Sequence, residues 1–206
     1  MTGSKTMATK EEFFATISQA LSANSARAPY PPYADTDLVA KPRVAGGSAE
    51  AVFRKNFAAA GGVTVSDLGE LKAELARHDT KRGVCDPALS ATLGGLDIEW
   101  TTTFDRQRPD DYAVGATIAS GAIAETGSLI LKDRATCDRL AALAPWVHVA
   151  VVRRADIFLT LPEALTRLGD DPYVVFATGP SKTADVEGIL IQGVHGPGAQ
   201  IAWLVD

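Results

Sequence analysis

The sequence predicts a protein of the α/β class, with one mostly parallel sheet that helices cover on both faces. Short apolar segments alternate with amphipathic segments of helical period along most of the chain. The short segments are apolar at nearly every position, as in parallel strands buried on both faces. The 206 residues give room for one sizeable core. We therefore expect a disordered tail at 1–10 and a single domain at 11–206.

The first half of the chain opens with a helix and a connector. Phe13, Ile17 and Leu21 recur at four-residue spacing, which predicts an amphipathic helix laid on a core. The prolines within 26–36 predict an extended connector. Beyond it we expect, in order, a helix at 51–62, a strand at 63–65, a helix carrying Leu68, Leu71 and Leu75, a strand at 82–85, a short helix at 87–95 and a strand at 96–100.

Capping residues support two of these helices. Ser66 or Asp67 can cap the helix that carries Leu68. Asp86 followed by Pro87 gives a cap and then a proline at the first helical position.

The second half continues the alternation around one tight turn. Residues 122–131, AIAETGSLIL, predict two apolar strands joined at Gly127, which can adopt the positive φ of a turn. The elements expected after them are a helix at 137–144, a strand at 146–152, a helix at 162–168, a strand at 173–177, a helix at 184–194 and a strand at 200–205.

Composition excludes several classes of function. The net charge of −5 shows no basic excess for binding nucleic acid or an anionic membrane. No apolar run approaches the roughly 20 residues of a spanning helix, and the start of the chain lacks the apolar stretch of a secretion signal, so we expect a cytoplasmic protein. Cys85 and Cys137 cannot supply the four thiolates of an ordinary iron–sulfur cluster. We find no metal-binding constellation and no G-x-G-x-x-G fingerprint, so no cofactor is expected from a recognisable motif.

The loop Thr178–Thr183, TGPSKT, is a candidate anion site because it is predicted to lead from a strand directly into a helix. The free N–H groups and dipole of the helix start, with Gly179, Ser181, Lys182 and Thr183, suit a carboxylate or a phosphate. The spacing differs from that of a Walker A loop. The alternative is that Ser181 or Thr183 simply caps the helix.

A second candidate is Glu125, which follows an apolar strand. Its carboxylate is either solvated on a turn or held in a desolvated cleft, where a raised pKa would suit a nucleophile or general base. Thr126, Gly127 and Ser128 add hydrogen-bond donors beside it.

His195 is a candidate acid–base group, since an imidazole titrates near neutral pH. A helix over 184–194 would advance the chain about 15 Å and place His195 at the opposite edge of the sheet from Ser181. A structural role at the helix end is the competing interpretation. His148 lies within an apolar strand and is expected to be a hydrogen-bonded core residue.

The turn at 122–131, the strand region 143–152 and the C-terminal segment 178–205 closely resemble the lactate utilization protein C family, the LUD-domain proteins. The resemblance covers at least residues 112–206. It implies the Rossmann-like fold of the NagB, ribose-phosphate isomerase and coenzyme A transferase superfamily. It also implies a subunit that takes part in oxidising L-lactate to pyruvate with iron–sulfur partner proteins, itself carrying no cluster.

Glu125, Thr126, Gly127, Gly179–Thr183 and His195 match motifs of this family. Glu125 and His195 are our catalytic candidates, and Thr126–Ser128, Gly179 and Ser181–Thr183 are our candidates for binding a 2-hydroxy acid or another anion. In coenzyme A transferases a glutamate in a strand-end loop attacks the acyl thioester, so a free-standing transferase or sugar-phosphate isomerase that uses Glu125 is the alternative function. A purely scaffolding role is a third.

Overall fold

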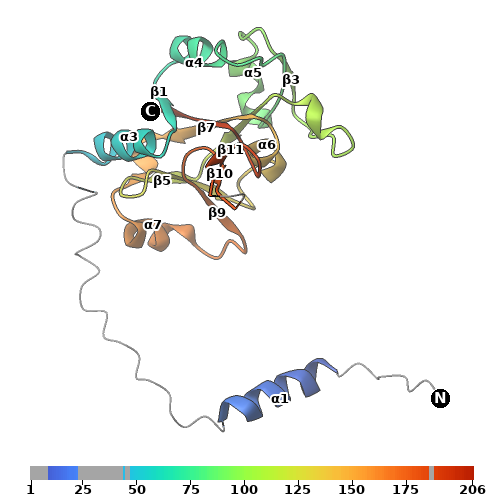
Figure 1. The fold of residues 1–206 in the computed structure, drawn as a ribbon. Coiled ribbons are helices and arrows are strands. Elements are labelled where there is room, and N and C mark those ends of the chain that lie inside the picture. Colours follow the sequence, from blue (N-terminus) through green and yellow to red (C-terminus); the bar gives the residue numbers. More distant parts are fainter. Residues whose placement is uncertain (1–8, 23–43, 45–46, 186–187) are drawn as a thin grey trace. The chain divides into compact units, whose positions relative to one another are not determined.

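The computed structural model describes residues 9–22, 44, 47–185 and 188–206 (Figure 1). The tail predicted at 1–10, except for its last two residues, and the connector predicted at 26–36 lie outside the described residues. The chain divides into two units, Met1–Thr36 and Asp37–Asp206. Of the first unit, the structure describes helix α1 (Lys10–Ser22), which is the predicted N-terminal helix.

A capping box begins α1. The Thr9 hydroxyl accepts a hydrogen bond from the backbone N–H of Glu12, and the Glu12 carboxylate accepts one from the N–H of Thr9. None of the residues of α1 is buried.

The second unit is built on a six-stranded sheet with strand order β1-β12-β7-β4-β2-β3, in which every neighbouring pair is parallel. This sheet confirms the predicted α/β class. The strands are β1 (Val63–Val65), β2 (Arg82–Cys85), β3 (Glu99–Thr101), β4 (Val114–Ile118), β7 (Val147–Arg153) and β12 (Ala199–Val205).

Helices lie on both faces of this sheet. On one face, Leu71 and Leu75 of α4 pack with Leu93 of α5 against the central strands. On the other face, Phe53 and Phe57 of α3 pack on the sheet. The helices of this unit are α3 (Ala49–Ala59), α4 (Leu68–Leu75), the 3-10 turn η1 (Pro87–Leu89), α5 (Ser90–Leu93), η2 (Pro109–Asp111), α6 (Arg139–Leu143), η3 (Arg154–Asp156) and α7 (Leu161–Leu168).

The predicted caps are present. The Asp67 side chain accepts from the N–H of Glu70 and begins α4, and the Asp86 side chain accepts from the N–H of Ala88 and begins η1.

A second sheet has the order β8-β5-β6-β9. Its strands are β8 (Ile157–Phe158), β5 (Gly121–Ile123), β6 (Ser128–Lys132) and β9 (Val174–Ala177). Its β5–β6 pair is the predicted tight hairpin and is antiparallel. Alternation along β6 sends Leu129 and Leu131 toward the large sheet and α3, and Ile130 toward α7. The alternation of elements in the sequence did not separate these strands from the parallel sheet.

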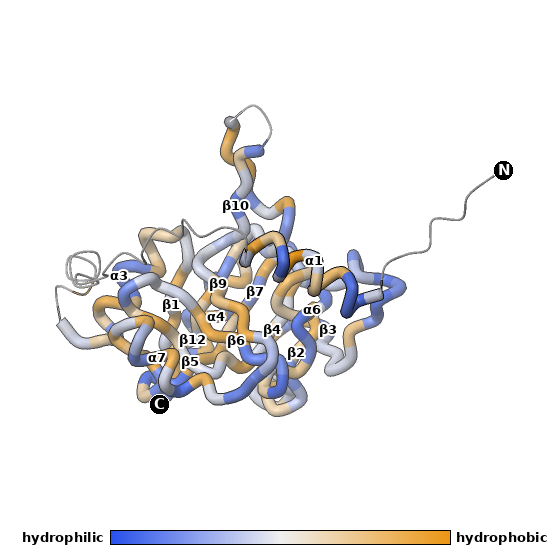
Figure 2. The backbone as a smooth tube through the Cα atoms, turned by 90° about the horizontal axis from the view of Figure 1, so that it is seen from below, coloured by the Kyte–Doolittle hydropathy of each residue, from blue (hydrophilic) through white to orange (hydrophobic). Residues whose placement is uncertain are grey.

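The helix predicted over 184–194 is wrong. Strands β10 (Lys182–Thr183) and β11 (Ile191–Gln192) pair antiparallel there and form a hairpin that stands out from the body (Figure 2). Gly188 and Gly193 adopt φ values of +72° and +82°, which a right-handed helix cannot contain. The apolar residues whose helical spacing predicted core packing are exposed here, Ile189 by 60% and Leu190 by 66%.

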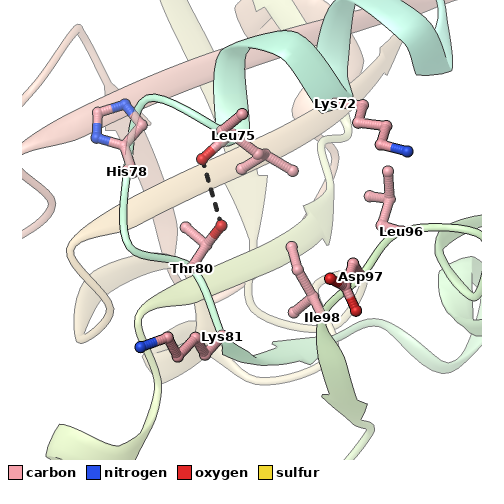
Figure 3. A pocket seen from close by; sticks show the side chains of 9 residues that line it. Lys72, Leu75, His78, Thr80, Lys81, Leu96, Asp97 and Ile98 are labelled. Carbon is pink, nitrogen blue, oxygen red and sulfur yellow. Dashed lines mark hydrogen bonds between the residues drawn. The ribbon is translucent and has the colours of Figure 1, made fainter.

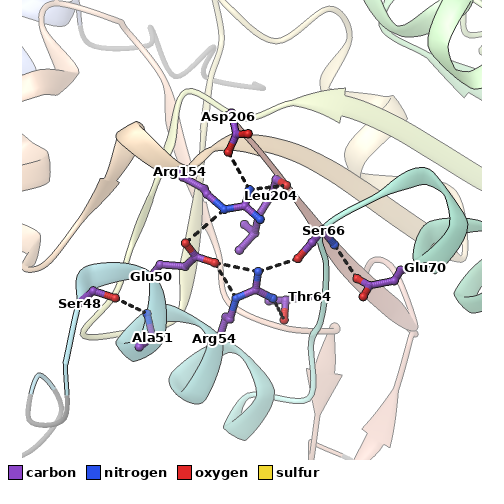
Figure 4. Close-up of polar contacts among 10 residues, drawn as sticks. All are labelled: Ser48, Glu50, Ala51, Arg54, Thr64, Ser66, Glu70, Arg154, Leu204 and Asp206. Carbon is purple, nitrogen blue, oxygen red and sulfur yellow. Dashed lines mark hydrogen bonds and ion pairs between the residues drawn. The ribbon is translucent and has the colours of Figure 1, made fainter.

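A polar network fastens α3 to the large sheet (Figure 4). The Arg54 guanidinium donates to Glu50 within α3, to Thr64 of β1 at 3.0 Å and to Ser66 at 2.8 Å. The Arg154 guanidinium pairs with Glu50 at 3.2 Å and donates to the carbonyl oxygen of Leu204 in β12 at 3.0 Å. The network therefore fixes the helix against which the loops of the candidate site pack.

Candidate functional site

Three loops singled out in the sequence come together near the C-terminal end of α3. The turn after β5 meets the loop after β9, because the hydroxyls of Ser128 and Thr178 are 2.6 Å apart. The loop after β9 meets the loop before β12, because the N–H of Ser181 donates to the carbonyl oxygen of Pro197 at 2.8 Å. Segments separated by about 70 residues thus form one continuous region.

Glu125 is the buried carboxylate of this region, with only 8% of its surface exposed. Its Oε1 accepts a hydrogen bond from the backbone N–H of Leu161 at 2.8 Å, at the start of α7. Its Oε2 is buried and has no hydrogen-bond partner among the described residues. A buried carboxylate oxygen without a partner is costly, and it marks a place where a hydrogen-bond donor on a ligand would be stabilised.

The backbone around Glu125 is fixed from two sides. Asn56 of α3 donates its amide N–H to the carbonyl oxygen of Ala124 at 2.7 Å and contacts that of Glu125 at 3.3 Å. The N–H of Glu125 donates to the carbonyl oxygen of Leu159. Neither Asn56 nor Leu161 was predicted, because they lie 69 and 36 residues from Glu125 and belong to no shared motif.

A chain of hydroxyl groups runs beside Glu125. Thr126 Oγ1 lies 2.7 Å from Ser128 Oγ, which lies 2.6 Å from Thr178 Oγ1. Each hydroxyl can donate one proton and accept others, so the chain can reorient as a unit. It places two predicted residues, Thr126 and Ser128, together with Thr178 from the second loop.

The glycines of the two loops serve packing against α3. Gly127 has φ +66°, and a Cβ there would lie 2.5 Å from the backbone nitrogen of Phe57. Gly179 has φ +68°, and a Cβ there would lie 2.4 Å from the carbonyl oxygen of Ala60. Both positions need glycine to let two backbones approach, in addition to the turn geometry that the sequence predicted.

The loop Gly179–Thr183 does not begin a helix, so the positive helix end expected at Ser181–Thr183 is absent. The Lys182 ammonium instead donates to the carbonyl oxygen of Ala60 at 2.6 Å, at the C-terminal end of α3. The Thr183 hydroxyl donates to the carboxylate of Asp185. This hydrogen bond, with a smaller effect from the charge of His195, keeps the pKa of Asp185 below its ordinary value. Anion binding by this loop stays a prediction, but the helix N-terminus that was expected to support it is not present.

His195 was expected at the opposite edge of the sheet from Ser181, and this is wrong. The β10–β11 hairpin brings the chain back beside the residue at which the hairpin begins. A Cβ on Gly196 would therefore lie 3.3 Å from Cβ of Ser181. The N–H of Gly193 also donates to the carbonyl oxygen of Ser181. His195 is exposed beside this junction, and a pocket of about 260 Å³ opens next to it, with Trp146, Gly193 and Gly196 in its wall.

His148 is confirmed as a core histidine. It is fully buried, with Nε2 2.9 Å from the hydroxyl of Thr117 and Nδ1 3.4 Å from the side-chain nitrogen of Gln200. Burial lowers the pKa of His148 from 6.5 to about 4, so the ring is neutral near pH 7.

The described residues contain no group of three or more His, Cys, Asp or Glu side chains placed to hold a metal ion. They also contain no helix with the length and apolar character needed to cross a membrane.

A family model described as the LUD domain matches residues 5–205. Lactate utilization protein C of Oceanobacillus iheyensis is 33% identical over 142 residues, which cover 62% of this chain and 61% of that protein. The protein of the same name from Deinococcus radiodurans is 35% identical over 95 residues, covering 44% of this chain and 43% of that protein. The chain thus spans less than two thirds of the length of these relatives.

A solved structure shares the fold. The crystal structure of a DUF162 family protein from Deinococcus radiodurans superposes with a TM-score of 0.54 and 24% sequence identity. The match covers 78% of this chain and 100% of that chain.

Proposed function

The chain belongs to the LUD domain family, and on this basis we propose that it is a subunit of a cytoplasmic L-lactate utilization system. In this system L-lactate loses two electrons and two protons to become pyruvate, and the electrons pass to partner proteins that carry iron–sulfur clusters. The observation that carries the proposal is the family match over residues 5–205. Two relatives that bear the name lactate utilization protein C support it.

In this proposal the chain contributes a substrate site and leaves electron transfer to its partners. Its two cysteines are too few for a cluster held by four thiolates. The 2-hydroxy acid carries a carboxylate and a hydroxyl group, and both need polar contacts. Ser181, Lys182 and Thr183 are the candidates for the carboxylate.

Glu125 is the proposed general base. Its Oε2 has no hydrogen-bond partner among the described residues, so it can accept the hydroxyl proton of a substrate that reaches it without first giving up another hydrogen bond. Its Oε1 stays bound to the N–H of Leu161, which keeps the carboxylate in place during the transfer. His195, at the neighbouring loop, is the proposed second acid–base group.

The test is lactate-dependent dye reduction by the candidate iron–sulfur partners, with and without this chain. We expect a rate that requires the chain and falls at least 100-fold with Glu125→Gln, as for loss of a general base. Glu163→Gln is the matched control, because Glu163 also lies at the start of α7 and its Oε2 is already occupied by the N–H of Leu159. A full rate from the partners alone would refute the proposal.

One observation favours a second function, a free-standing coenzyme A transferase-like enzyme. The Oε2 of Glu125, which has no partner within the described part of the chain, could attack the carbonyl carbon of an acyl thioester, breaking the C–S bond, releasing the coenzyme A thiolate and forming a glutamyl anhydride. Acetyl-CoA mixed with the isolated chain would then release free thiol and add mass to the wild type but not to Glu125→Gln. No thiol release from the wild type excludes this second function. A sugar-phosphate isomerase reaction would instead show as turnover of a sugar phosphate that Glu125→Gln removes.

A further inference from the structure

A pocket of about 300 Å³ opens between the C-terminal end of α4 and the residues that lead into β2 and β3 (Figure 3). It shares no residue with the loops around Glu125. Its volume is at the lower end of the range for small-molecule sites. No role in the proposed lactate system accounts for it.

The floor of the pocket is apolar. Leu75 and Leu96 supply it with only 3% and 7% of their surfaces exposed, and Ile98 continues it toward β3. Lys72 and Leu75 are three residues apart on α4, so the helix presents a cation and an apolar side chain to the same side. The pocket therefore joins an apolar wall to a charged rim.

The rim carries more positive than negative charge. The cations Lys72 and Lys81 line it with a single carboxylate, Asp97, and with the imidazole of His78. The ammonium of Lys72 makes no ion pair with a described residue. Lys81 lies 3.5 Å from Asp79, but both side chains are more than 80% exposed, and such pairs contribute little and exchange readily. Both lysines can turn to an anion in the pocket.

The walls of the pocket are held by backbone hydrogen bonds. The N–H of His78 donates to the carbonyl oxygen of Leu75, and the N–H of Glu99 donates to that of Lys81 at 2.9 Å. The Thr80 hydroxyl contacts the carbonyl oxygen of Leu75 at 3.4 Å (Figure 3). A preformed wall reduces the ordering cost of binding.

We propose that this pocket binds a small organic anion with an apolar body, of the class of short-chain monocarboxylates. Lys72 and Lys81 lie on opposite sides of the pocket (Figure 3), so the carboxylate contacts one of these two lysines and the hydrocarbon chain lies on Leu75, Leu96 and Ile98. An uncharged apolar ligand would make no use of the lysines. A small hydroxy acid such as lactate has less apolar surface to set against Leu75, Leu96 and Ile98.

The probe is hexanoate, titrated into the ¹⁵N-labelled full chain and followed by amide chemical shifts. We expect saturable shifts confined to residues 72–81 and 96–98. The double variant Lys72→Gln, Lys81→Gln removes both candidate cations and should weaken binding about fivefold, as for the loss of one exposed ion pair. Lys55→Gln, which removes an exposed lysine of α3 outside the pocket, should leave the affinity unchanged.

Two comparison ligands separate the parts of the proposal. Hexanol lacks the anion and L-lactate lacks the apolar body, and both should bind more weakly than hexanoate. The proposal is overturned if hexanoate shifts do not saturate, if hexanol binds equally well, if L-lactate binds more tightly, or if the double variant keeps the wild-type affinity. None of these readouts depends on lactate oxidation, so they stand apart from the test of the proposed function.

Discussion

The side-chain amide of Asn56 lies 2.7 Å from the carbonyl oxygen of Ala124, so one residue of α3 holds the strand end that carries Glu125. This contact joins a helix to a loop 68 residues further along the chain. The position of the buried carboxylate is therefore set by α3, and α3 is set by the network of Arg54 and Arg154. Several predictions about stability depend on these contacts.

Asn56→Ala should destabilise the protein by about 1 kcal/mol, because it removes the 2.7 Å hydrogen bond to the carbonyl oxygen of Ala124, which keeps only the longer bond of 3.3 Å from the N–H of Gly127. Urea unfolding followed by circular dichroism measures the change. Lys55→Ala is the control, since Lys55 is exposed on the same helix, and its midpoint should stay near that of the wild type. Equal midpoints for the two variants would show that Asn56 does not hold the loop.

Gly127→Ala should be far more harmful than Gly169→Ala. Both glycines have a positive φ, +66° and +67°, so a side chain at either position adds backbone strain of about 1–3 kcal/mol, and the ψ of −147° at Gly169 makes its strain no smaller. A Cβ at Gly127 would press on the backbone of α3 at 2.5 Å, whereas a Cβ at Gly169 meets nothing within 4 Å. Overpacking of this kind costs a further 1–3 kcal/mol or so. Thermal unfolding of both variants measures this difference. If both lose the same stability, the close approach to α3 is not the reason that position 127 needs glycine.

Arg54→Lys should destabilise the protein by about 1–2 kcal/mol, although the charge is kept. A guanidinium reaches Glu50, Thr64 and Ser66 together through its fixed fork, and an ammonium cannot. The control is Arg77→Lys, because Arg77 is 73% exposed and makes one ion pair with Glu74. If chemical unfolding finds the same small effect for both substitutions, the network does not fasten α3.

The lowered pKa of His148 predicts that the free energy of unfolding decreases as the pH falls. Its pKa is about 4 in the folded protein and near 6.5 when exposed, so the unfolded chain binds a proton first. Above about pH 6.5 the ring is neutral in both states and does not oppose folding. As the pH falls toward 4, the ring is protonated in the unfolded chain but not in the folded protein, and the free energy of unfolding decreases. The whole shift corresponds to about 3 kcal/mol.

Carboxylates also titrate in this interval, so the measurement compares two proteins. The unfolding free energy of the wild type should fall more steeply between pH 6.5 and pH 4.5 than that of His148→Gln, which has no ionisable ring. Parallel pH profiles for the two proteins would contradict the assignment.

Local signals in the sequence predicted most of the elements. The run WVHVAVV predicted a buried strand with His148 in the core, and Asp67 and Asp86 predicted two helix starts, because each of these depends on neighbours along the chain. Glu125 was identified as a site candidate for the same reason, although its sequence neighbours left open whether its carboxylate is solvated or buried. Its partners Asn56 and Leu161 depend on tertiary packing, which no spacing in the sequence encodes.

The error at 184–194 has a physical cause. Ile189, Leu190 and Val194 recur at helical spacing, and the same order of residues also fits two short strands joined by a turn. Gly188 was the contrary signal, because a glycine inside a helix weakens it and one with positive φ ends it. The sequence did not predict the second sheet for a related reason, because an apolar run indicates a strand but not which other strand it pairs with.

The base of the β10–β11 hairpin is closed by its own bonds. The N–H of Gly193 meets the carbonyl oxygen of Ser181, and the N–H of Ser181 meets that of Pro197. These hydrogen bonds fix the two ends of the hairpin to each other. The start of β12 is therefore set by the base of the hairpin and not by its tip. The chain can gain or lose residues there without shifting the register of β12. Length at the tip of this hairpin is free to vary, while its base is held constant.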